Sequence, residues 1–332
     1  MKVLVTGGTG FLGRNVVRRL LDGGDVVRVL VRPSRTGQYP HLAILNEHGR
    51  QAAAEEVIGD LCDSSSLRQV LDGIEAVCHC AARVQVGGSW SDFKEVNIRG
   101  TERLLEEACR ERIKRFLHVS TLGVYGLDGQ ETTITEESPL DEGNRGYYTR
   151  SKIESERLIW KYSRERDLPV TVIRPGILYG PGKPPFVSRP FVALGPKLRI
   201  AIARPEQRLP LTYVENVAEA IHLALHSNRA IGRAYNVVDE AVLQEDYLAL
   251  LSRVGLNHAR TILLPPTPIY LLLSLSEHFC RWLGVAPPVS RDQFQRALAS
   301  ILYDTSRARE ELGWSPKVGM AEALSKIREA RA

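Results

Sequence analysis

The sequence is poor in cysteine, and the few cysteines it has do not form the pattern of a secreted protein. Its 332 residues include five cysteines, an odd number, at widely spaced positions. Small secreted domains instead carry even sets that pair as disulfides. The first residues also lack the charged and long apolar regions of a signal peptide. We therefore expect a cytoplasmic protein that is not exported.

Blocks of like charge and long apolar runs are also missing. Lysine and arginine number 44 against 39 aspartates and glutamates, for a net charge of +5, and the two signs are interspersed. Binding to nucleic acid is therefore not indicated. The most apolar stretch, residues 269–273, is too short to span a bilayer. We expect a substrate-lid or core helix there, with an interfacial membrane helix as the alternative, and no stable membrane insertion.

The sequence predicts no metal site. Cys78, His79 and Cys80 are adjacent, but they end an apolar run typical of a buried strand. In such a strand the two cysteines share one face and the histidine takes the other. A structural zinc site takes four protein ligands, and we find no second ligand pair to complete this one.

A regular alternation of short apolar runs and longer amphipathic segments fills the first half of the chain. With 43% hydrophobic residues the chain can also bury a large core. Parallel strands joined by crossover helices produce this pattern, so we predict an α/β fold with a doubly wound parallel sheet. The expected strands are residues 2–5, 27–31, 56–58, 76–79, 115–119 and 170–174, and a helix is expected over residues 93–111.

The first expected strand runs into a glycine-rich turn, Thr6-Gly7-Gly8-Thr9-Gly10-Phe11-Leu12-Gly13, which opens a helix. In this context Gly7 allows a tight turn, Gly10 lets the backbone approach a pyrophosphate, and Gly13 lets the helix pack closely on the strand. The unpaired amides at the helix start then face the phosphates. We predict a Rossmann dinucleotide site here, in preference to an ordinary strand-to-helix turn. Its expected contacts are Gly7, Thr9, Gly10, Phe11, Leu12 and Gly13.

The end of the second expected strand bears on the choice of dinucleotide. A carboxylate there binds the ribose 2′-hydroxyl of NAD, whereas a cation accommodates the extra phosphate of NADP. This strand ends at Arg32, with no acidic residue beside it. The guanidinium group suits a phosphate, so we predict NADP(H), with NAD(H) as the alternative if Arg32 is only a solvated loop residue.

A tyrosine and a lysine stand one turn apart at the start of a helix expected to run towards Tyr162. Tyr148 and Lys152 share a face of this helix, and Tyr147 has no lysine four residues on. An ammonium group near a phenol is expected to lower its pKa from about 10. Tyr148 then becomes a usable proton donor or acceptor.

The composition changes after Gly180, where five prolines lie between residues 181 and 196. We therefore place an NAD(P)-binding domain at residues 1–180. A helix over 214–225 and a strand over 234–238 are expected to return to it, so that residues 212–240 belong with it. Residues 181–211 and 241–332 are then expected to form a smaller substrate-binding region.

Taken together, these motifs resemble the extended short-chain dehydrogenases/reductases of the epimerase/dehydratase superfamily, over nearly the whole chain. The matching segments are the glycine turn, Gly59-Asp60-Leu61, Cys80-Ala81-Ala82, residues 97–101, Ser120-Thr121 with Val124-Tyr125-Gly126, residues 148–152, Arg174-Pro175-Gly176, residues 179–182, residues 213–218 and residues 312–316.

The resemblance implies roles for the matching residues. Thr121 is the expected catalytic hydroxyl because it lies four residues before Tyr125, with Ser120 as the competing assignment, and Asn97 is expected to be structural. Lys152 would also hold the nicotinamide ribose. The further cofactor contacts implied are Asp60 and Leu61 at the adenine, Ala81 and Ala82 along the ribose and nicotinamide, and Pro175 and Ile177 beside the nicotinamide ring.

Within that family the chain is most similar to the branch of 3β-hydroxysteroid dehydrogenases and dihydroflavonol reductases. This implies hydride transfer between the nicotinamide and a ketone or secondary alcohol of an apolar small molecule. The alternative is a nucleotide-sugar epimerase or dehydratase. Gly176 and Ile177 stand where such enzymes carry an Arg-x-Phe-Asn stretch, and Arg208 lies one residue out of register with their phosphate-binding arginine. A third possibility, a sensor that binds cofactor without turnover, is disfavoured because Tyr148 and Lys152 are both present. Relatives are often homodimers through helices that match residues 93–111 and 148–162.

Overall fold

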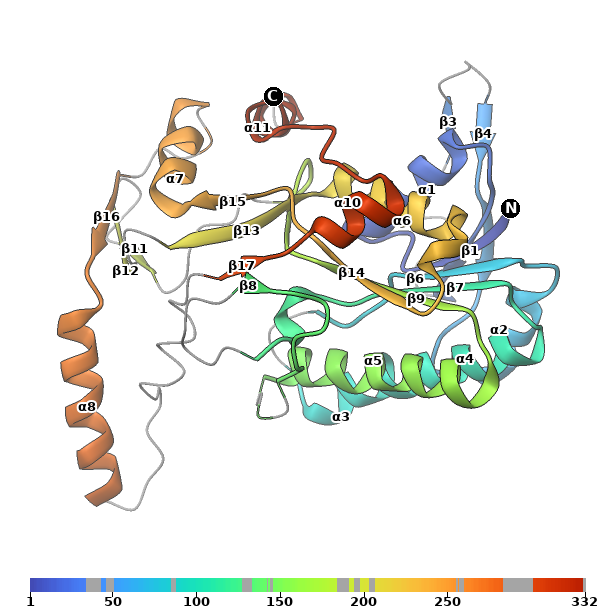
Figure 1. The fold of residues 1–332 in the computed structure, drawn as a ribbon, viewed down its shortest axis with the longest axis horizontal. Coiled ribbons are helices and arrows are strands. Elements are labelled where there is room, and N and C mark those ends of the chain that lie inside the picture. The colour runs from blue at the N-terminus through green and yellow to red at the C-terminus, as the bar shows by residue number, and fades with distance from the viewer. Residues whose placement is uncertain are drawn as a thin grey trace.

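A parallel sheet forms the centre of the computed structural model (Figure 1). The described residues are 1–33, 43–45, 51–84, 88–126, 133–141, 143, 146–183, 191–193, 198–202, 207–254, 256, 260–282 and 301–330. The sheet has seven strands in the order β14-β9-β7-β6-β1-β2-β5, and every pair is parallel. Its strands are β1 (Lys2–Thr6), β2 (Val26–Val31), β5 (Glu55–Ile58), β6 (Ala76–His79), β7 (Arg115–Val119), β9 (Val170–Pro175) and β14 (Arg233–Val237).

The predicted doubly wound sheet is confirmed, with each expected strand in place. The chain turns from β1 to β2 on one side and reaches β6 on the other, so the strand order reverses at β1. In sheets of this kind ligands bind in the crevice outside the carboxyl ends of the strands at the reversal. The glycine turn that follows β1 lies at that edge.

Two layers of helices cover the sheet (Figure 1). One face carries α1 (Phe11–Asp22), α6 (Val214–His226) and α10 (Ser306–Leu312), and the other carries α2 (Ser64–Leu71), α4 (Gly100–Arg110) and α5 (Tyr147–Arg166). Each helix buries one apolar stripe; in α1 it consists of Val16, Val17, Leu20 and Leu21. Separate apolar cores therefore form above and below the sheet.

The helix expected over residues 93–111 is more complex than its sequence pattern indicates. It consists of a short helix, α3 (Trp90–Phe93), a π-helical segment, η3 (Lys94–Arg99), and then α4. A π-helical turn carries one more residue than an α-helical turn and is frequent at functional sites. This segment carries Asn97, whose contacts are described below.

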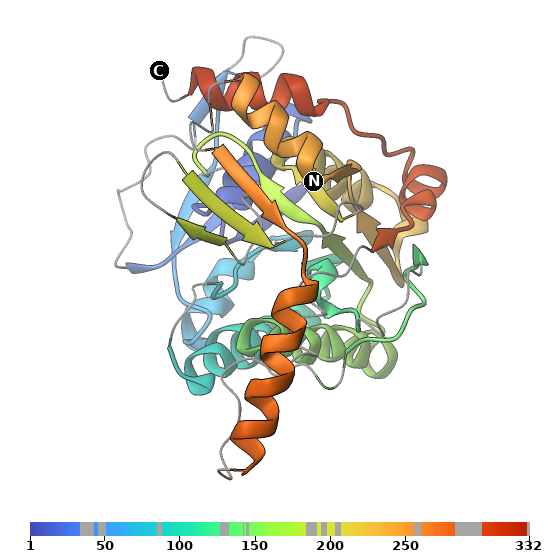
Figure 2. The same cartoon turned by 90° about the vertical axis from the view of Figure 1, so that its left-hand side faces the viewer.

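A smaller region follows β9 and lies beyond the carboxyl edge of the large sheet (Figures 1 and 2). Its core includes Tyr179, Tyr213, Tyr247 and Leu324. The elements of this part of the chain are β10 (Ile177–Tyr179), β11 (Phe191–Ala193), β12 (Leu198–Ile202), β13 (Arg208–Tyr213), β15 (Glu240–Leu243), α7 (Gln244–Arg253), β16 (Arg260–Leu264), α8 (Thr267–Trp282) and α11 (Met320–Glu329). Short elements elsewhere are β3 (Ala43–Leu45), β4 (Gln51–Ala53), η4 (Leu122–Val124), β8 (Thr133–Ile134), η5 (Asn228–Ala230) and β17 (Leu302–Tyr303). The division into two regions stays a prediction, and α10 with Trp314 packs on the core of the large sheet.

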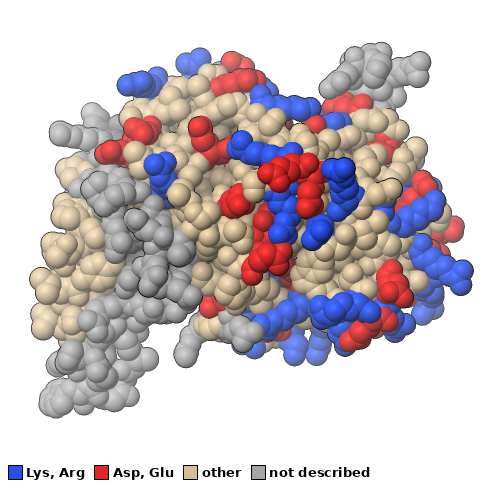
Figure 3. All heavy atoms as spheres, in the orientation of Figure 1, with Lys and Arg blue, Asp and Glu red and all other residues tan. Residues whose placement is uncertain are grey.

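The apolar stretch near residue 270 lies in α8, which projects from the body (Figure 2). Leu271, Leu272 and Leu275 are 66%, 63% and 69% exposed, so the expectation of a core helix is wrong for this part of α8. Within the described residues, no helix combines the length and apolarity needed to cross a bilayer. Lys, Arg, Asp and Glu side chains are intermixed over the face drawn in Figure 3, without a block of one sign.

A buried ion pair fastens α5 to the sheet. The Arg174 guanidinium group, on β9, donates to both Glu156 carboxylate oxygens, with Nε at 3.1 and 3.3 Å. Its Nη1 donates to the Tyr125 hydroxyl at 2.5 Å and to the Glu136 carbonyl oxygen at 3.1 Å. The Glu156 side chain is fully buried and that of Arg174 is 5% exposed. Two charges out of water are tolerated here because each has several partners.

We predict that Glu156→Gln destabilises the fold by about 3 kcal/mol, because a neutral amide leaves the buried Arg174 charge uncompensated. Guanidinium unfolding followed by circular dichroism measures this loss. The matched control, Glu154→Gln, removes an exposed ion pair with Arg150 on the same helix and should cost about 0.5 kcal/mol or less. Equal losses in the two variants would contradict the assignment.

Candidate active site

The glycine turn between β1 and α1 is held in a form that only glycine permits at two positions. Gly7 has a φ of +70°, and a Cβ there would lie 2.8 Å from the Ala81 backbone nitrogen. A Cβ on Gly13 would lie 2.0 Å from the Gly7 carbonyl oxygen. That oxygen accepts a hydrogen bond from the Gly10 amide at 2.9 Å. The turn thus brings the start of α1 close to β1 and to the residues after β6.

The first turn of α1 is open to a ligand. Gly10 is its N-cap, and no side chain caps the amides that follow. Helix-start amides without intrahelical partners favour an anion such as a pyrophosphate. Thr9, Phe11 and Leu12 are half-buried at this turn, and Lys183 lies over the Phe11 ring at 5.3 Å. These residues therefore fit a dinucleotide phosphate site.

Five further predicted contacts follow three strands of the sheet, β6, β5 and β2. Ala81 and Ala82 follow β6 and are half-buried next to the turn. Asp60 and Leu61 follow β5, where the Asp60 carboxylate accepts from the Cys62 amide at 2.9 Å and Leu61 is buried. Arg32 lies at the carboxyl end of β2, as expected, and is exposed.

The position of Ala81 is fixed by a chain of hydrogen bonds that the sequence did not reveal. The Ala81 amide donates to the Thr6 hydroxyl at 3.3 Å, and this oxygen lies 2.7 Å from His79 Nδ1. His79 Nε2 lies 2.9 Å from the Thr101 hydroxyl, which donates to the Asn97 carbonyl at 2.6 Å. Burial, followed by the charge of Lys152, lowers the pKa of His79 to about 3. The ring is therefore neutral, and its two nitrogens contact the hydroxyl groups of Thr6 and Thr101.

Lys152 is buried beneath the carboxyl end of β7. Its ammonium group donates to the Val119 carbonyl oxygen at 2.7 Å and lies 3.0 Å from His118 Nε2. Burial lowers the pKa of Lys152 to about 8, and the nearby Glu156 carboxylate opposes that shift. Lys152 is thus a cation near neutral pH, with its position set by the backbone.

Tyr148 differs from the expectation in one respect. Burial raises the pKa of Tyr148 to about 12, whereas Lys152 was expected to lower it. The reason is that Lys152 contacts the Val119 carbonyl and His118 at the end of β7. In this form of the protein the phenol keeps its proton at neutral pH, which is the state of a proton donor.

The two candidate hydroxyls before Tyr125 have different surroundings. The Thr121 oxygen caps η4 by accepting from the Gly123 amide at 3.2 Å, so its own proton remains available. Ser120 is buried, and its hydroxyl has no hydrogen-bond partner among the described residues. Thr121 is half-exposed and Ser120 is the more enclosed of the two. Both remain candidates, and Thr121 stays the assignment.

Asn97 connects three parts of the site. Its amide nitrogen donates to the Ser151 hydroxyl at 2.8 Å and to the Arg83 carbonyl at 3.1 Å, and its oxygen accepts from the Arg83 amide at 2.7 Å. Ser151 in turn donates to the Tyr148 carbonyl at 2.7 Å. Asn97 therefore links the first turn of α5 to the segment after β6, a positioning role.

The residues predicted beside a nicotinamide ring lie where the large sheet passes into the smaller region. Pro175 ends β9 and Ile177 begins β10. Between them, a Cβ on Gly176 would lie 2.2 Å from the Pro210 carbonyl oxygen. No side chain fits at that position without moving β13. Arg208, on β13, is exposed and donates to the Ala241 carbonyl at 2.9 Å.

Sequence reasoning missed His79 and His118 as parts of the site. Both are fully buried histidines in apolar strands that end at the catalytic edge, and this was the available signal. Their partners lie on other elements, so the residue types alone did not indicate which contacts they make.

The fold and the open glycine turn define a Rossmann nucleotide-binding protein, and comparison with known proteins defines it further. Residues 3–237 match the model of the NAD dependent epimerase/dehydratase family. The chain is 27% identical to a 3 beta-hydroxysteroid dehydrogenase/Delta 5-->4-isomerase of Mycobacterium tuberculosis, covering 98% of this chain and 88% of that protein. It is 30% identical to a dTDP-glucose 4,6-dehydratase of Streptomyces niveus, covering 98% and 90%.

The fold has a close counterpart among solved structures as well. The UDP-glucuronic acid 4-epimerase from Bacillus cereus, crystallised in complex with NAD, superimposes with a TM-score of 0.75 at 22% identity, covering 99% of this chain and 98% of that one. The chain belongs to the NAD dependent epimerase/dehydratase family, that is, to the extended short-chain dehydrogenases/reductases.

We predict that Gly10→Ala weakens binding of a nicotinamide dinucleotide about tenfold or more, with little effect on folding. A Cβ on Gly10 meets only the Gly7 carbonyl, at 3.1 Å, so the turn survives while the methyl group occupies the phosphate approach. Fluorescence titration and thermal unfolding measure the two effects. The control Gly319→Ala, at another helix start with open space around it, should change neither quantity. If Gly10→Ala bound the dinucleotide as tightly as the wild-type protein, the phosphates would not bind at this turn.

Proposed function

We propose that the protein transfers a hydride between a nicotinamide dinucleotide, preferably NADP(H), and a ketone or secondary alcohol of an apolar small molecule. When bound, the cofactor supplies or accepts the hydride. The observation that supports this most directly is the position of Lys152, which lies one turn after Tyr148 on α5. Its buried ammonium group donates to the carbonyl oxygen of Val119, at the end of β7 and two residues before Thr121.

Each of the three residues would then have a distinct task. Tyr148 donates its phenolic proton to the substrate oxygen during reduction and takes one back during oxidation. Thr121 donates a hydrogen bond to the same oxygen and so orients it. Lys152 holds the ribose of the cofactor from its buried position at the end of β7. The proton retained on Tyr148 is the one that reduction of a ketone would consume.

An apolar substrate is supported by the surroundings of Gly176 and Ile177. Gly176 is crowded by β13, and the neighbouring Ile177 is a half-buried apolar side chain. The relative from Mycobacterium tuberculosis is a 3 beta-hydroxysteroid dehydrogenase, and a steroid is such an apolar molecule.

The alternative is an epimerase or dehydratase acting on a nucleotide sugar. The Streptomyces relative carries such a name, and the same tyrosine and lysine would serve both reactions. A nucleotide sugar needs polar or cationic partners for its diphosphate. The side chains at Gly176 and Ile177 provide neither an amide group nor a cation to bind a diphosphate, which favours the reductase.

The test is turnover of a substrate panel by the wild-type protein and by Tyr148→Phe. We expect NADPH-dependent reduction of a steroid, flavonoid or 3-oxo-acyl ketone, reduced at least a thousandfold in the variant, since the loss removes the proton donor. Cofactor affinity should change less than about twofold, because phenylalanine keeps the ring and its packing.

Tyr147→Phe is the matched control, since Tyr147 is adjacent, 47% exposed and packs on Trp90 and Phe93. It should retain full activity. Epimerisation or dehydration of a nucleotide sugar by the wild-type protein, with no ketone reduced, would establish the alternative.

The preference for NADP(H) is supported by Arg32 at the end of β2. We predict that Arg32→Ala raises the Kd of NADPH about tenfold to a hundredfold, the value of a charge-assisted phosphate contact, and leaves the Kd of NADH unchanged. Titration with both cofactors measures this. Arg164→Ala, which removes an exposed arginine at the far end of α5, is the control. Tighter binding of NADH than NADPH by the wild-type protein would contradict the proposal.

A cytoplasmic location and a homodimer stay predictions from the sequence. In the expected dimer, α4 and α5 would face their copies in the second subunit, with a small molecule as the other binding partner of each subunit.

A further inference from the structure

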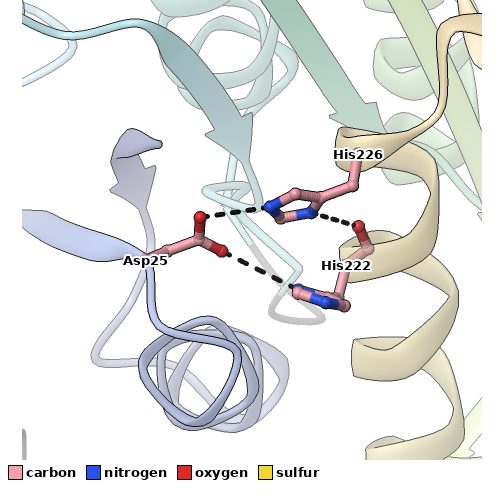
Figure 4. A group of neighbouring side chains, drawn as sticks. All are labelled: Asp25, His222 and His226. Carbon is pink, nitrogen blue, oxygen red and sulfur yellow. Dashed lines mark hydrogen bonds and ion pairs between the residues drawn. The ribbon is translucent and has the colours of Figure 1, made fainter.

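A cluster of three metal-binding side chains lies at the edge of the sheet opposite the active site (Figure 4). Asp25 stands between the end of α1 and the start of β2, and His222 and His226 lie in the last turns of α6. The two histidines are four residues apart, so both rings emerge from one face of the helix. Because α1 and α6 pack against each other, that face meets Asp25.

The atoms that would bind an ion already converge. One nitrogen or oxygen from each residue can be chosen so that all three lie within 4.8 Å of one another. His226 Nε2 lies 3.1 Å from Asp25 Oδ1, and His222 Nδ1 lies 3.8 Å from Asp25 Oδ2. A tetrahedral site with bonds of about 2.0–2.1 Å places its ligand atoms roughly 3.3–3.4 Å apart. The two histidine nitrogens face different oxygens of the same carboxylate, each within about 0.5 Å of this separation.

Two of these atoms lack a partner although they are buried. Asp25 Oδ2 and His222 Nδ1 make no hydrogen bond, and the Asp25 side chain is only 2% exposed. The other carboxylate oxygen, Oδ1, accepts from the Met1 amino group at 2.8 Å. An unpartnered buried carboxylate oxygen is costly unless a proton or a cation reaches it. This oxygen points at the nitrogen of His222 (Figure 4).

The orientation of His226 is also that of a metal ligand. Its Nδ1 lies 2.9 Å from the His222 carbonyl oxygen, a contact that requires the proton on Nδ1. Nε2 then faces Asp25 Oδ1 at 3.1 Å, where either a proton on Nε2 or a metal ion in its place would join the two atoms. Metal-binding histidines commonly donate their second nitrogen to a backbone carbonyl in this way.

Neighbouring residues shape the cluster around His222. A Cβ on Gly23 would lie 2.5 Å from His222 Cε1, so the ring rests against a residue without a side chain. Glu219 binds Arg19 and Lys317, so these two cations are compensated close by.

We propose that Asp25, His222 and His226 bind a zinc ion, with water as the fourth ligand. Two imidazoles and one carboxylate suit a late first-row divalent ion and offer too few oxygens for magnesium or calcium. Asp25 and His226 are 201 residues apart in the chain, so the sequence expectation of no metal, which considered adjacent ligands, did not reach this site.

The expected role is structural. Val26 pairs with Lys2 at the start of β1, and the glycine turn follows Thr6 at its end, so about 13 Å of strand separates the cluster from the dinucleotide edge. A zinc ion here would join α6 to the α1–β2 connection without touching the reacting atoms.

The test uses the full chain after treatment with EDTA. Calorimetric titration should show one Zn²⁺ bound per chain and no binding of Mg²⁺, and saturating Zn²⁺ should raise Tm by about 5 °C. His222→Gln and His226→Gln should weaken zinc binding at least a hundredfold. Gly23→Ala keeps all three ligands but displaces the His222 ring, so it should weaken binding about tenfold.

Cys62→Ser is the matched control, because Cys62 is an exposed thiol that could capture zinc by itself. It should leave stoichiometry and Tm shift unchanged. X-ray absorption of the wild-type zinc complex provides a readout that does not depend on how the variants fold, and it should show only nitrogen and oxygen ligands. The proposal would be overturned by sulfur ligands to the zinc or by zinc binding below one ion per chain. It would also be overturned if the two histidine variants bound zinc as tightly as the wild-type protein.

Discussion

The ion pair between Glu156 and Arg174 is the interaction on which the geometry of the site depends. It fastens α5 to β9, in the interior, at the point where α5 also carries Lys152 one turn earlier. A helix held only by its apolar stripe can slide or rotate with small changes in packing, whereas a bidentate contact between buried charges fixes one register. The ammonium group of Lys152 therefore meets the end of β7 at a defined position.

The same pair also acts on the charge of Lys152. Burial lowers the pKa of Lys152 to about 8, and the Glu156 carboxylate opposes the shift. Arg174 holds the Glu156 carboxylate in place, because its Nε donates to both carboxylate oxygens. The lysine thus stays a cation near neutral pH inside a region where an isolated ammonium group would lose its proton. The Glu156 carboxylate thus contributes both to the stability of the fold and to the positive charge of Lys152.

The sequence was sufficient for the parts of the site whose signal is local. The strands were recognised from their apolar runs, and the glycine turn from its place between a strand and a helix. It was insufficient where a contact joins distant segments: the bonds of His79 and Asn97, and the approach of Lys152 to Val119, depend on which strands are neighbours. The pKa of Tyr148 was expected in the wrong direction for this reason, since helix spacing gives the distance to Lys152 but not the other groups that bind it.

In the proposed mechanism Tyr148 and Lys152 determine where a proton moves, whichever molecule is the substrate. The choice of substrate falls to residues outside the large sheet, and there the physical constraint is steric. Gly176 is pressed against the Pro210 carbonyl, so the chain between β9 and β10 can present only backbone and the Ile177 side chain to a ligand. A diphosphate bound there would lose water without gaining a side-chain donor or a cation, at a cost of several kcal/mol for a charged group. An apolar molecule would not incur this cost, and this supports the proposed ketone substrate over a nucleotide sugar.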